Sequence, residues 1–478
     1  MENITVEDIV KACGGTLLAG NGRRYLSRIR LDSRQVEAGD LFVPIIGEKV
    51  DAHRFIPQVI RQGAGAVLTS RHSGEEARTI IEELEKEMPD AEPAAWIQVD
   101  DTKQALQAVG AFCRSRLSIP VIGITGSVGK TTTREMTAAA LGAGLQVFKT
   151  PGNSNSQVGV PIAVSEIFQA DQAAVIELGM SEPGEMTRIA KVALPTMAMI
   201  TNIGITHIEQ LGSRENIFRE KMNIQDGLKD GGVLLLNGDD DMLKEAKARD
   251  GHGYRTLYYG TGANSDYRAE DIREENGFPV FTAVYQEERV PVRLNVMGRH
   301  NVLNAMAALA AAREHGVPME AAAKSLEAFS GFAGRQQIYR SHGLTVIDDT
   351  YNASPVSMKA GLSVLCAMEG QKRRIAVLAD MKELGEDTVS FHREVGSFAA
   401  GLSVDALITY GELAEEILQG ARTEGNKRLQ LFHFSSKDQL ISFLDRFLEE
   451  GDCILFKGSH SMGLGEVAAR YGRKKDKD

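Results

Sequence analysis

The feature that most constrains this chain is a glycine-rich turn between an apolar run and a helix-forming run. The apolar run is VIGIT (residues 121–125), the turn is GSVGKTT (126–132), and TREMTAAALGAGL follows. In this order the three segments form a phosphate-binding loop, whose glycines let successive backbone N–H groups point at phosphate oxygens. The helix N-terminus adds partial positive charge. The pattern therefore predicts a parallel α/β sheet that binds a nucleoside triphosphate with Mg²⁺.

The side chains of this loop predict how the charge of the triphosphate is balanced. Lys130 would neutralise the β- and γ-phosphates, and the hydroxyl of Thr131 would ligate Mg²⁺. The strict GxxxxGK[ST] pattern is not met, because position 124 is Ile, and the loop is instead TGxxGKTT. We expect the nucleotide to contact Gly126, Ser127, Val128, Gly129, Lys130, Thr131 and Thr132.

Apolar runs alternate with helical patterns along most of the 478 residues, which suggests about three domains. Residues 1–100 are typical of a small mixed α/β domain. Residues 101–334 predict a central P-loop domain with a parallel sheet, although 254–298 is more polar and hairpin-like. Residues 335–478 predict a C-terminal Rossmann-like, doubly wound domain with five candidate strands. The predicted fold class is α/β.

Charge and composition limit the partners and the compartment. Lys and Arg number 54 against 65 Asp and Glu, a net charge of −11, which gives no general attraction to nucleic acid or to anionic membranes. An apolar run of about 18 residues and a secretory signal are both absent from the sequence. The four cysteines are far apart and form no CxxC pair. We expect a cytoplasmic monomer that binds neither nucleic acid nor membrane.

Polar side chains end or follow the other apolar runs of the central region. Glu177 ends AAVIE, Asn202 follows TMAMIT, and His207 lies just beyond it. Functional groups gather at the carboxyl ends of parallel strands, and a carboxylate suits Mg²⁺. His207 fits a metal ligand and a structural histidine equally well. Lys221 lies in the polar helical stretch REKMNIQDGL, whose pattern by itself predicts a solvated lysine.

Several motifs, taken in order, resemble the Mur ligases, a family of ATP-dependent amide-bond ligases of cell-wall precursor synthesis. The N-terminal region has DSRQVEAGDLFVPIIGEKVDAHRF, and the centre has GITGSVGKTTT, PGNSNSQVGVP, ELGMSEPGEM and TNIGITHIEQLGS. MGRHNVLNAMAALA, GR at 334–335, DDTYNASPVSM, LADMKELG and FKGS follow. ELGMSEPGEM and DDTYNASPVSM are similar to the type that adds D-Ala-D-Ala to UDP-MurNAc-tripeptide.

This resemblance implies an ADP-forming ligase that uses ATP and two Mg²⁺ ions. The γ-phosphoryl group would activate the tripeptide carboxylate as an acyl phosphate, and the amine of D-Ala-D-Ala would then displace phosphate. UDP-MurNAc-tripeptide and D-Ala-D-Ala are the implied small-molecule substrates. Because water would hydrolyse an acyl phosphate, the C-terminal domain is expected to close over the site.

The resemblance also implies roles for the matching residues. Lys130, His207 and Lys221 would be catalytic, with Lys221 carbamylated by CO₂ into a carboxylate-like ligand. The metal ligands would be Thr131, Glu177, His207 and Lys221. The nucleotide contacts outside the P-loop would be Asn301 at the adenine, Arg335 and Asp349. The sugar-peptide contacts would be Asp32, Ser33 and Arg34 near the uridine, together with Asn153, Ser154 and Asn352.

Three positions depart from the family pattern. Asn223 stands where members often have Glu, and His460 and Gly463 stand where members often have Arg. These departures bear on the carbamate geometry and on the amine substrate. A related ligase with another amine or acyl acceptor therefore stays open, as does a ligase resembling folylpolyglutamate synthase or a P-loop ATPase that switches binding. NAD binding is disfavoured, because no GxGxxG follows LTVIDDT.

Overall fold

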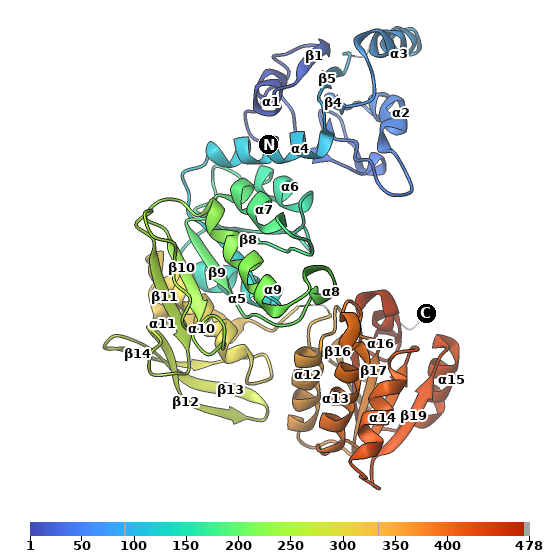
Figure 1. Cartoon of the computed structure of the whole chain (residues 1–478). Coiled ribbons are helices and arrows are strands. Elements are labelled where there is room, and N and C mark those ends of the chain that lie inside the picture. Colours follow the sequence, from blue (N-terminus) through green and yellow to red (C-terminus); the bar gives the residue numbers. More distant parts are fainter. Residues whose placement is uncertain (90–91, 333, 473–478) are drawn as a thin grey trace.

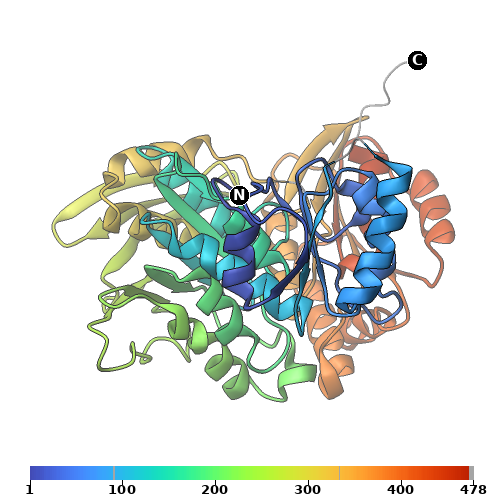
Figure 2. The same ribbon diagram turned by 90° about the horizontal axis from the view of Figure 1, so that it is seen from above.

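The computed structural model describes residues 1–89, 92–332 and 334–472. Three sheets follow one another along this part of the chain, and each is covered by helices (Figure 1). The N-terminal domain stands at one end of the central domain, and the C-terminal domain lies at its other end. Seen from above, the central and C-terminal domains lie side by side (Figure 2). The α/β fold class and the three-domain architecture are as predicted.

The N-terminal sheet has the strand order β1-β5-β4-β3-β2, in which β1 is antiparallel to its neighbour and the other strands are parallel. The parallel strands therefore end at one edge of the sheet, and the segment 32–34 lies there, directly after β2. The elements are α1 (Val6–Cys13), β1 (Thr16–Ala19), β2 (Ile29–Arg30), η1 (Ser33–Gln35), β3 (Leu41–Phe42), α2 (Ile56–Arg61), β4 (Ala66–Thr69), α3 (Gly74–Glu87) and β5 (Ala95–Gln98).

Helix α4 (Thr102–Ser115) joins this domain to the central one. Its residues Leu106 and Val109 belong to the N-terminal core, while its other side packs on α6 and α7 of the central domain. At Gly110 a Cβ atom would lie 2.7 Å from Cα of Pro161, so glycine permits this close approach. The buried Arg114 guanidinium donates to the carbonyl of Ala193 at 3.0 Å. These contacts hold the two domains together.

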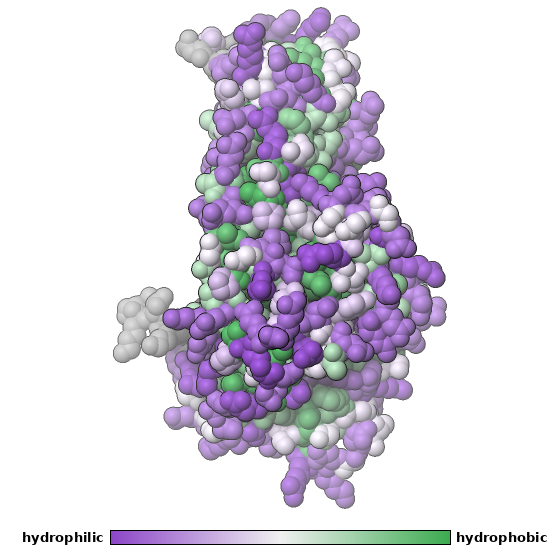
Figure 3. Space-filling view, turned by 90° about the vertical axis from the view of Figure 1, so that its left-hand side faces the viewer, coloured by the Kyte–Doolittle hydropathy of each residue, from purple (hydrophilic) through white to green (hydrophobic). Residues whose placement is uncertain are grey.

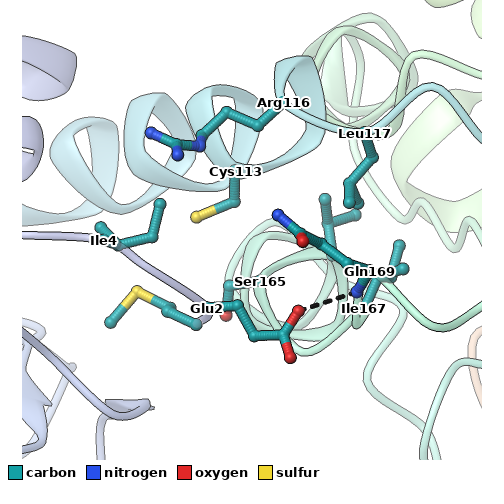
Figure 4. A pocket seen from close by; sticks show the side chains of 10 residues that line it. Glu2, Ile4, Cys113, Arg116, Leu117, Ser165, Ile167 and Gln169 are labelled. Atoms are coloured by element: carbon teal, nitrogen blue, oxygen red, sulfur yellow. Dashed lines mark hydrogen bonds between the residues drawn. The ribbon is translucent and has the colours of Figure 1, made fainter.

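The chain terminus adds a second junction between the same domains (Figure 4). Within the N-terminal domain, the amine of Met1 donates to the carbonyl of Ser27 at 2.6 Å. Across the junction, the Glu2 carboxylate accepts from the backbone N–H of Gln169 at 2.8 Å. The small cavity at this junction has a volume of about 20 Å³, which is space for little more than one water molecule. It is a packing defect between domains and not a ligand site.

The central sheet has the order β14-β13-β12-β11-β10-β9-β6-β8-β7. Strands β6 to β12 lie parallel to their neighbours, whereas β13 and β14 are antiparallel. The predicted parallel sheet is therefore mixed, because the short turns at 276–277 and 286–287 allow only hairpins. Its strands are β6 (Val121–Thr125), β7 (Val147–Lys149), β8 (Ala173–Glu177), β9 (Met197–Ile200), β10 (Val233–Asn237), β11 (Arg255–Gly260), β12 (Tyr267–Glu275), β13 (Phe278–Tyr285) and β14 (Glu288–Arg293).

Two cores flank this sheet. The P-loop helix α5 and the Ala-rich helix α10 pack together on one face, while α6 and α7 cover the other. The helices are α5 (Lys130–Leu141), α6 (Gly159–Ser165), α7 (Glu185–Ala193), α8 (Ile208–Leu211), α9 (Arg214–Met222), α10 (Asn301–Glu314) and α11 (Met319–Ala328).

The C-terminal sheet has the order β15-β16-β20-β17-β18-β19, with all neighbours parallel except the edge strand β15. The five predicted strands are present. Strand β15 (QIYRS) was not predicted, because its polar, half-buried sequence lacks the apolar run that marks the others. The elements are β15 (Gln337–Ser341), β16 (Leu344–Asp349), α12 (Pro355–Ala367), β17 (Arg373–Ala379), η4 (Gly385–Asp387), α13 (Thr388–Ala400), β18 (Ala406–Tyr410), α14 (Glu415–Thr423), β19 (Gln430–Phe434), α15 (Lys437–Phe447), β20 (Asp452–Lys457), η5 (His460–Met462) and α16 (Leu464–Gly472).

Polar side chains cover most of the face in Figure 3, with apolar ones scattered between them. The four cysteines lie within the described residues and are free thiols, of which Cys113 and Cys453 are buried and Cys13 and Cys366 half-buried. Over the same residues, none of the helices combines the length and the apolar character needed to cross a membrane.

Candidate active site

A cavity of about 520 Å³ opens where the central and C-terminal domains meet. One wall is the P-loop, and the opposite wall comes from the ends of β16 and β20 and the start of α12. The sequence-predicted residues on its walls are Ser127, Val128, Gly129, Lys130, Thr131, Thr132, His207, Asn301, Arg335, Asp349 and Asn352. Residues more than 200 positions apart in the sequence therefore line the same cavity.

The P-loop has the conformation that its glycines were predicted to allow. Gly126 and Gly129 have φ values of 149° and 87°, which side chains larger than glycine rarely adopt. The ammonium of Lys130 donates to the carbonyl of Gly126 at 2.8 Å, and burial lowers its pKa. Asn202 braces the loop through Val128, accepting from its N–H at 2.9 Å and donating to its carbonyl at 2.8 Å.

Glu177 at the end of β8 is 2% exposed and carries hydrogen bonds on both carboxylate oxygens. Oε1 accepts from Asn155 at 2.7 Å and from Thr131 at 3.3 Å. Oε2 accepts from the buried guanidinium of Arg134 at 3.1 Å. The sequence analysis missed Arg134 and Asn155. The signal was available for Arg134, which follows Lys130 by four residues on the same helix face.

The loop after β7 lies beside this carboxylate. Arg134 donates at 2.7 Å to the carbonyl of Gly152, so the loop and Glu177 share one guanidinium. Within this loop Asn153 is exposed and Ser154 half-buried, and Asn155 is the residue that reaches the carboxylate. Asn153 and Ser154, predicted to contact the sugar-peptide, thus lie in the loop that also carries Asn155.

Lys221 is 1% exposed, so the solvated lysine that its polar surroundings predicted is wrong. Lys221 lies near the end of α9. The preceding residue, Glu220, accepts a hydrogen bond from the backbone N–H of Met186 on α7 at 2.9 Å. Burial lowers the pKa of Lys221 well below its usual value, and the nearby Lys130 ammonium lowers it further. Burial and the neighbouring cation thus both disfavour the charged form of the Lys221 amine, while the adjacent Glu220 carboxylate favours it.

His207 projects from the turn between β9 and α8, and its ring lies on the cavity wall. Its Nδ1 atom lies 2.8 Å from Oε2 of Glu383, a residue of the C-terminal domain. Glu383 was quoted within the motif LADMKELG but not singled out.

The predicted nucleotide contacts outside the P-loop also come together. Asn301 and Asn304 share one face of α10, as their spacing predicted, and are joined by a hydrogen bond of 2.9 Å. Arg335 donates to the Thr131 hydroxyl at 3.2 Å and lies over the ring of Tyr351, 4.0 Å from its centroid. Asp349 pairs with Lys457 at 2.7 Å. Arg335 thus links the P-loop to the C-terminal domain directly.

Asp32, Ser33 and Arg34 lie apart from this cavity, on the N-terminal sheet. Asp32 caps η1, and the guanidinium of Arg34, 2.6 Å away, lowers the pKa of Asp32 to about 2. Arg34 is exposed, whereas Ser33 is buried. A ligand spanning this site and the cavity would extend across the central domain.

The residues near the P-loop fit Mg²⁺ bound through phosphates. The described residues contain no cluster of three His, Cys, Asp or Glu side chains. Mg²⁺ commonly uses one or two protein carboxylates and takes its other ligands from water and substrate phosphates. The Thr131 hydroxyl and the buried Glu177 carboxylate supply such hard oxygen donors, and they lie 3.3 Å apart.

The structure shows the surroundings of the three residues that depart from the family pattern. Asn223 contacts Glu220 at 3.4 Å and Arg249 at 2.9 Å. The ring of His460 lies 6.0 Å from that of Tyr351, near the cavity. Gly463 has a φ of 66° and ends η5, so a longer side chain there would strain the backbone and meet Lys437.

The P-loop domain, the second α/β domain across the cavity and the N-terminal α/β domain together define a three-domain ligase of one family. Residues 26–112 match the description "Mur ligase family, catalytic domain", 124–312 match "Mur ligase middle domain", and 334–460 match "Mur ligase, glutamate ligase domain". The chain belongs to the Mur ligase family.

Several similar proteins are named as D-alanyl-D-alanine-adding ligases of this family. The UDP-N-acetylmuramoyl-tripeptide–D-alanyl-D-alanine ligase of Bacillus subtilis is 37% identical, and the match covers 97% of each chain. The Escherichia coli ligase of the same name is 31% identical over 98% of each chain. The crystal structure of MurF from Acinetobacter baumannii has a TM-score of 0.85 at 32% identity and covers 98% of this chain and 99% of that one. MurF ligase from Thermotoga maritima in complex with ADP has a TM-score of 0.78 at 28% identity, over 92% and 96%.

Proposed function

We infer that the chain is an ATP-dependent, ADP-forming ligase that joins D-alanyl-D-alanine to UDP-N-acetylmuramoyl-tripeptide in peptidoglycan precursor synthesis. The family assignment favours this ligase over a binding switch. The single structural observation that carries it is the cavity between the P-loop and the C-terminal strand ends. There an ATP-binding loop faces a second domain that can deliver an amine.

We propose the following division of roles. Lys130 leaves the Gly126 carbonyl and binds the phosphates, while Thr131 and Glu177 hold Mg²⁺, which would offset charge on the transferring phosphoryl group. Asn301 faces the adenine, and Arg335 and Asp349 contact the nucleotide from the C-terminal side. Arg335 adds positive charge where the γ-phosphate would lie, since it already touches the Thr131 hydroxyl.

The reaction joins a carboxylate to an amine through an activated acyl group. The tripeptide carboxylate oxygen attacks the γ-phosphorus, and the bond to the β-bridging oxygen breaks to leave ADP. The amine of D-Ala-D-Ala then attacks the acyl carbon, loses a proton, and displaces phosphate. The C-terminal domain keeps water from the acyl phosphate. We propose that residues 1–100 form the sugar-binding domain and residues 101–334 the ATP-binding domain. Residues 335–478 would form the domain that closes on ATP and the amine substrate.

We further propose that Lys221 reacts with CO₂. The neutral amine nitrogen attacks the carbon of CO₂ and releases one proton, which leaves a carbamate anion. Support comes from the burial of Lys221 and from the strongly lowered pKa of its amine. His207 and the carbamate would hold a second Mg²⁺. Isotopically labelled bicarbonate should give a protein-bound carbamate NMR signal that Lys221→Met abolishes; an unchanged spectrum would contradict the proposal.

The sugar-peptide would extend from the N-terminal sheet to the cavity. We propose that Asp32, Ser33 and Arg34 hold the uridine end. Asn153 and Ser154 would lie along the sugar, and Asn352 near the reacting end. We also propose that the enzyme works as a monomer, because residues of one chain line the catalytic cavity. We further propose that it is cytoplasmic and has no nucleic acid or membrane partners, which its net charge of −11 supports. Light scattering of the purified protein tests the monomer.

The deciding experiment measures phosphate release from ATP and Mg²⁺ with one component omitted at a time. Phosphate should appear only when UDP-MurNAc-tripeptide and D-Ala-D-Ala are both present, and the product mass should equal their sum less one water. Comparing L-lysine and meso-diaminopimelate tripeptides identifies the third residue. Phosphate release without either substrate would support a switch ATPase, and another amine replacing D-Ala-D-Ala would point to His460 and Gly463.

A further inference from the structure

The loop that follows β9, residues 201–209, contacts the P-loop on one side. The hydroxyl of Thr201 donates to the carbonyl of Val128 at 2.7 Å, and the backbone N–H of Gly204 donates to the hydroxyl of Ser127 at 2.8 Å. We call residues 201–209 the bridging loop. Because the bridging loop is hydrogen-bonded to the P-loop at these points, a displacement of the bridging loop would also move the P-loop, where the phosphates bind.

The other side of the bridging loop contacts the C-terminal domain. Ile205 packs against the core of that domain, which includes Met381 and Leu384. Farther along, Gly385 lies so close to Glu209 that a Cβ atom on the glycine would be 3.6 Å from the Cα of Glu209. Figure 1 shows α8, which begins within this loop, on the side of the central domain that faces the C-terminal domain. The loop is therefore held between the P-loop and the C-terminal domain.

One polar contact crosses this junction. Oε2 of Glu383 lies 2.8 Å from Nδ1 of His207. The two atoms are in ion-pair contact without the alignment of a hydrogen bond, and among the described residues this buried Nδ1 has no hydrogen-bond partner. The Glu383 side chain is half exposed, whereas that of His207 is 23% exposed. A small rotation of the carboxylate or the ring would complete the bond.

Both partners of this contact have an unusual backbone conformation. His207 has a φ of 65° and Glu383 a φ of 63°, in the left-handed region that residues other than glycine seldom adopt. Such strain persists where surrounding contacts hold it, and it often marks functional sites. Here it turns both side chains toward the same junction, from two different domains.

We propose that Glu383 is a positioning residue of the C-terminal domain, whose carboxylate fixes the ring of His207 with Nε2 toward the nucleotide cavity. A carboxylate on one ring nitrogen commonly orients a histidine whose other nitrogen binds a metal. Because Glu383 comes from another domain, His207 is oriented only while the C-terminal domain is docked. The inference rests on the proposed role of His207 toward Mg²⁺, and it makes metal binding depend on domain docking.

The test measures binding of Mn²⁺, used in place of Mg²⁺, to the full-length protein saturated with ADP, by electron paramagnetic resonance. Glu383→Gln should weaken Mn²⁺ binding about tenfold, the lower end of the usual effect of losing such a partner. Glu383→Asp should recover part of the loss, and ADP affinity without divalent cations should be unchanged. The matched control is Glu386→Gln, an exposed glutamate of the same turn, which should bind Mn²⁺ like the original protein.

A double-mutant cycle with His207→Ala separates this inference from the proposed function. If Glu383 acts through His207, Glu383→Gln should have no further effect in the His207→Ala background. If His207→Ala weakens Mn²⁺ binding but Glu383→Gln matches the Glu386→Gln control, the positioning role is wrong and the role of His207 stands. Additive effects would also overturn it, since Glu383 would then act independently. If His207→Ala leaves Mn²⁺ binding unchanged, both proposals fail.

Discussion

Two lysines at the domain junction are almost fully buried and have opposite surroundings. Lys221 on α9 is 1% exposed and Lys457 at the end of β20 is 2% exposed. The ammonium of Lys457 lies 2.7 Å from the carboxylate of Asp349 and 3.0 Å from the carbonyl of Asn352. For Lys221, by contrast, no ion pair occurs among the described residues, and its neighbour Glu220 bonds to Met186 instead. Burial alone therefore does not determine what a lysine does.

The two lysines differ in the charged groups that lie next to each amine. Burial lowers the pKa of both lysines, but Asp349 opposes this effect at Lys457. At Lys221 the nearby cation of Lys130 adds to it and outweighs the opposing effect of the Glu220 carboxylate. A neighbouring carboxylate favours the charged form of a buried amine, whereas a neighbouring cation disfavours it. We therefore expect Lys457 to contribute to stability and Lys221, as proposed above, to contribute to the chemistry.

The largest expected effect comes from Lys457→Met. This change leaves the buried Asp349 carboxylate without its cation, which should reduce the free energy of unfolding by about 3–5 kcal/mol. Urea denaturation measures the loss. The control is Lys359→Met, which removes an ion pair with the half-exposed Glu394 and should cost less than about 1 kcal/mol. Equal losses in the two variants would break the comparison.

The second effect is on catalysis. Lys221→Met should reduce phosphate release with both substrates about a hundredfold or more, because this variant cannot form the proposed carbamate anion near the phosphoryl site. Its free energy of unfolding should stay the same or rise, since an unpaired buried amine is replaced by an apolar side chain. Lys191→Met, on the exposed face of α7, is the control. Full activity in Lys221→Met would remove this lysine from the mechanism.

A third prediction concerns the carboxylate nearest this site. Asn155→Ala removes the 2.7 Å hydrogen bond to Glu177, and losing a bond to a charged group should cost about 1.5 kcal/mol of stability. The Mg²⁺ concentration needed for half-maximal activity should shift, because Oε1 of Glu177 is less well oriented. Asn153→Ala, in the exposed part of the same loop, should leave stability unchanged. If the two variants have the same stability, Asn155 does not support Glu177.

The smallest expected effect is a pH dependence of stability. The folded-state pKa of Lys221 lies well below 10.5, so between these values the unfolded chain binds the extra proton. The contribution of Lys221 to stability therefore rises with pH across this window, by at most about 1.4 kcal/mol per pH unit. The stability advantage of Lys221→Met should shrink as pH rises toward 10.5. Urea unfolding in CO₂-free buffer measures it, and a constant difference would show that the folded-state pKa is normal.

Local patterns predicted the parts of the site that depend on neighbouring residues. The P-loop, the strand that ends at Glu177, and the shared face of Asn301 and Asn304 all follow from short-range spacing. The antiparallel end of the central sheet was partly visible in the polar, hairpin-like segment 254–298. Strand β15 was not, because pairing along the edge of a sheet does not require an apolar run.

Long-range contacts decided the rest. The sequence around Arg134 is that of an ordinary helix, and its partner Glu177, 3.1 Å away, comes from the distant strand β8. The sequence around Glu383 is that of a turn, and its partner His207 comes from a different domain. The spacing from Lys130 was a local signal for Arg134 itself, but the partners in these two pairs have no local signal, because the members of each pair are 43 and 176 residues apart.

By itself the sequence determined a three-domain α/β chain with an ATP-binding loop and, through its ordered motifs, a resemblance to one ligase family. Those properties depend on backbone conformation and hydrophobic periodicity, which neighbouring residues specify. Only the tertiary structure decided that Lys221 is buried, although its local pattern predicts a solvated side chain. Burial and pairing depend on which distant surfaces meet, and the pKa of an amine follows from that environment. The same residue type therefore has a carboxylate partner at position 457 and no ion pair among the described residues at position 221.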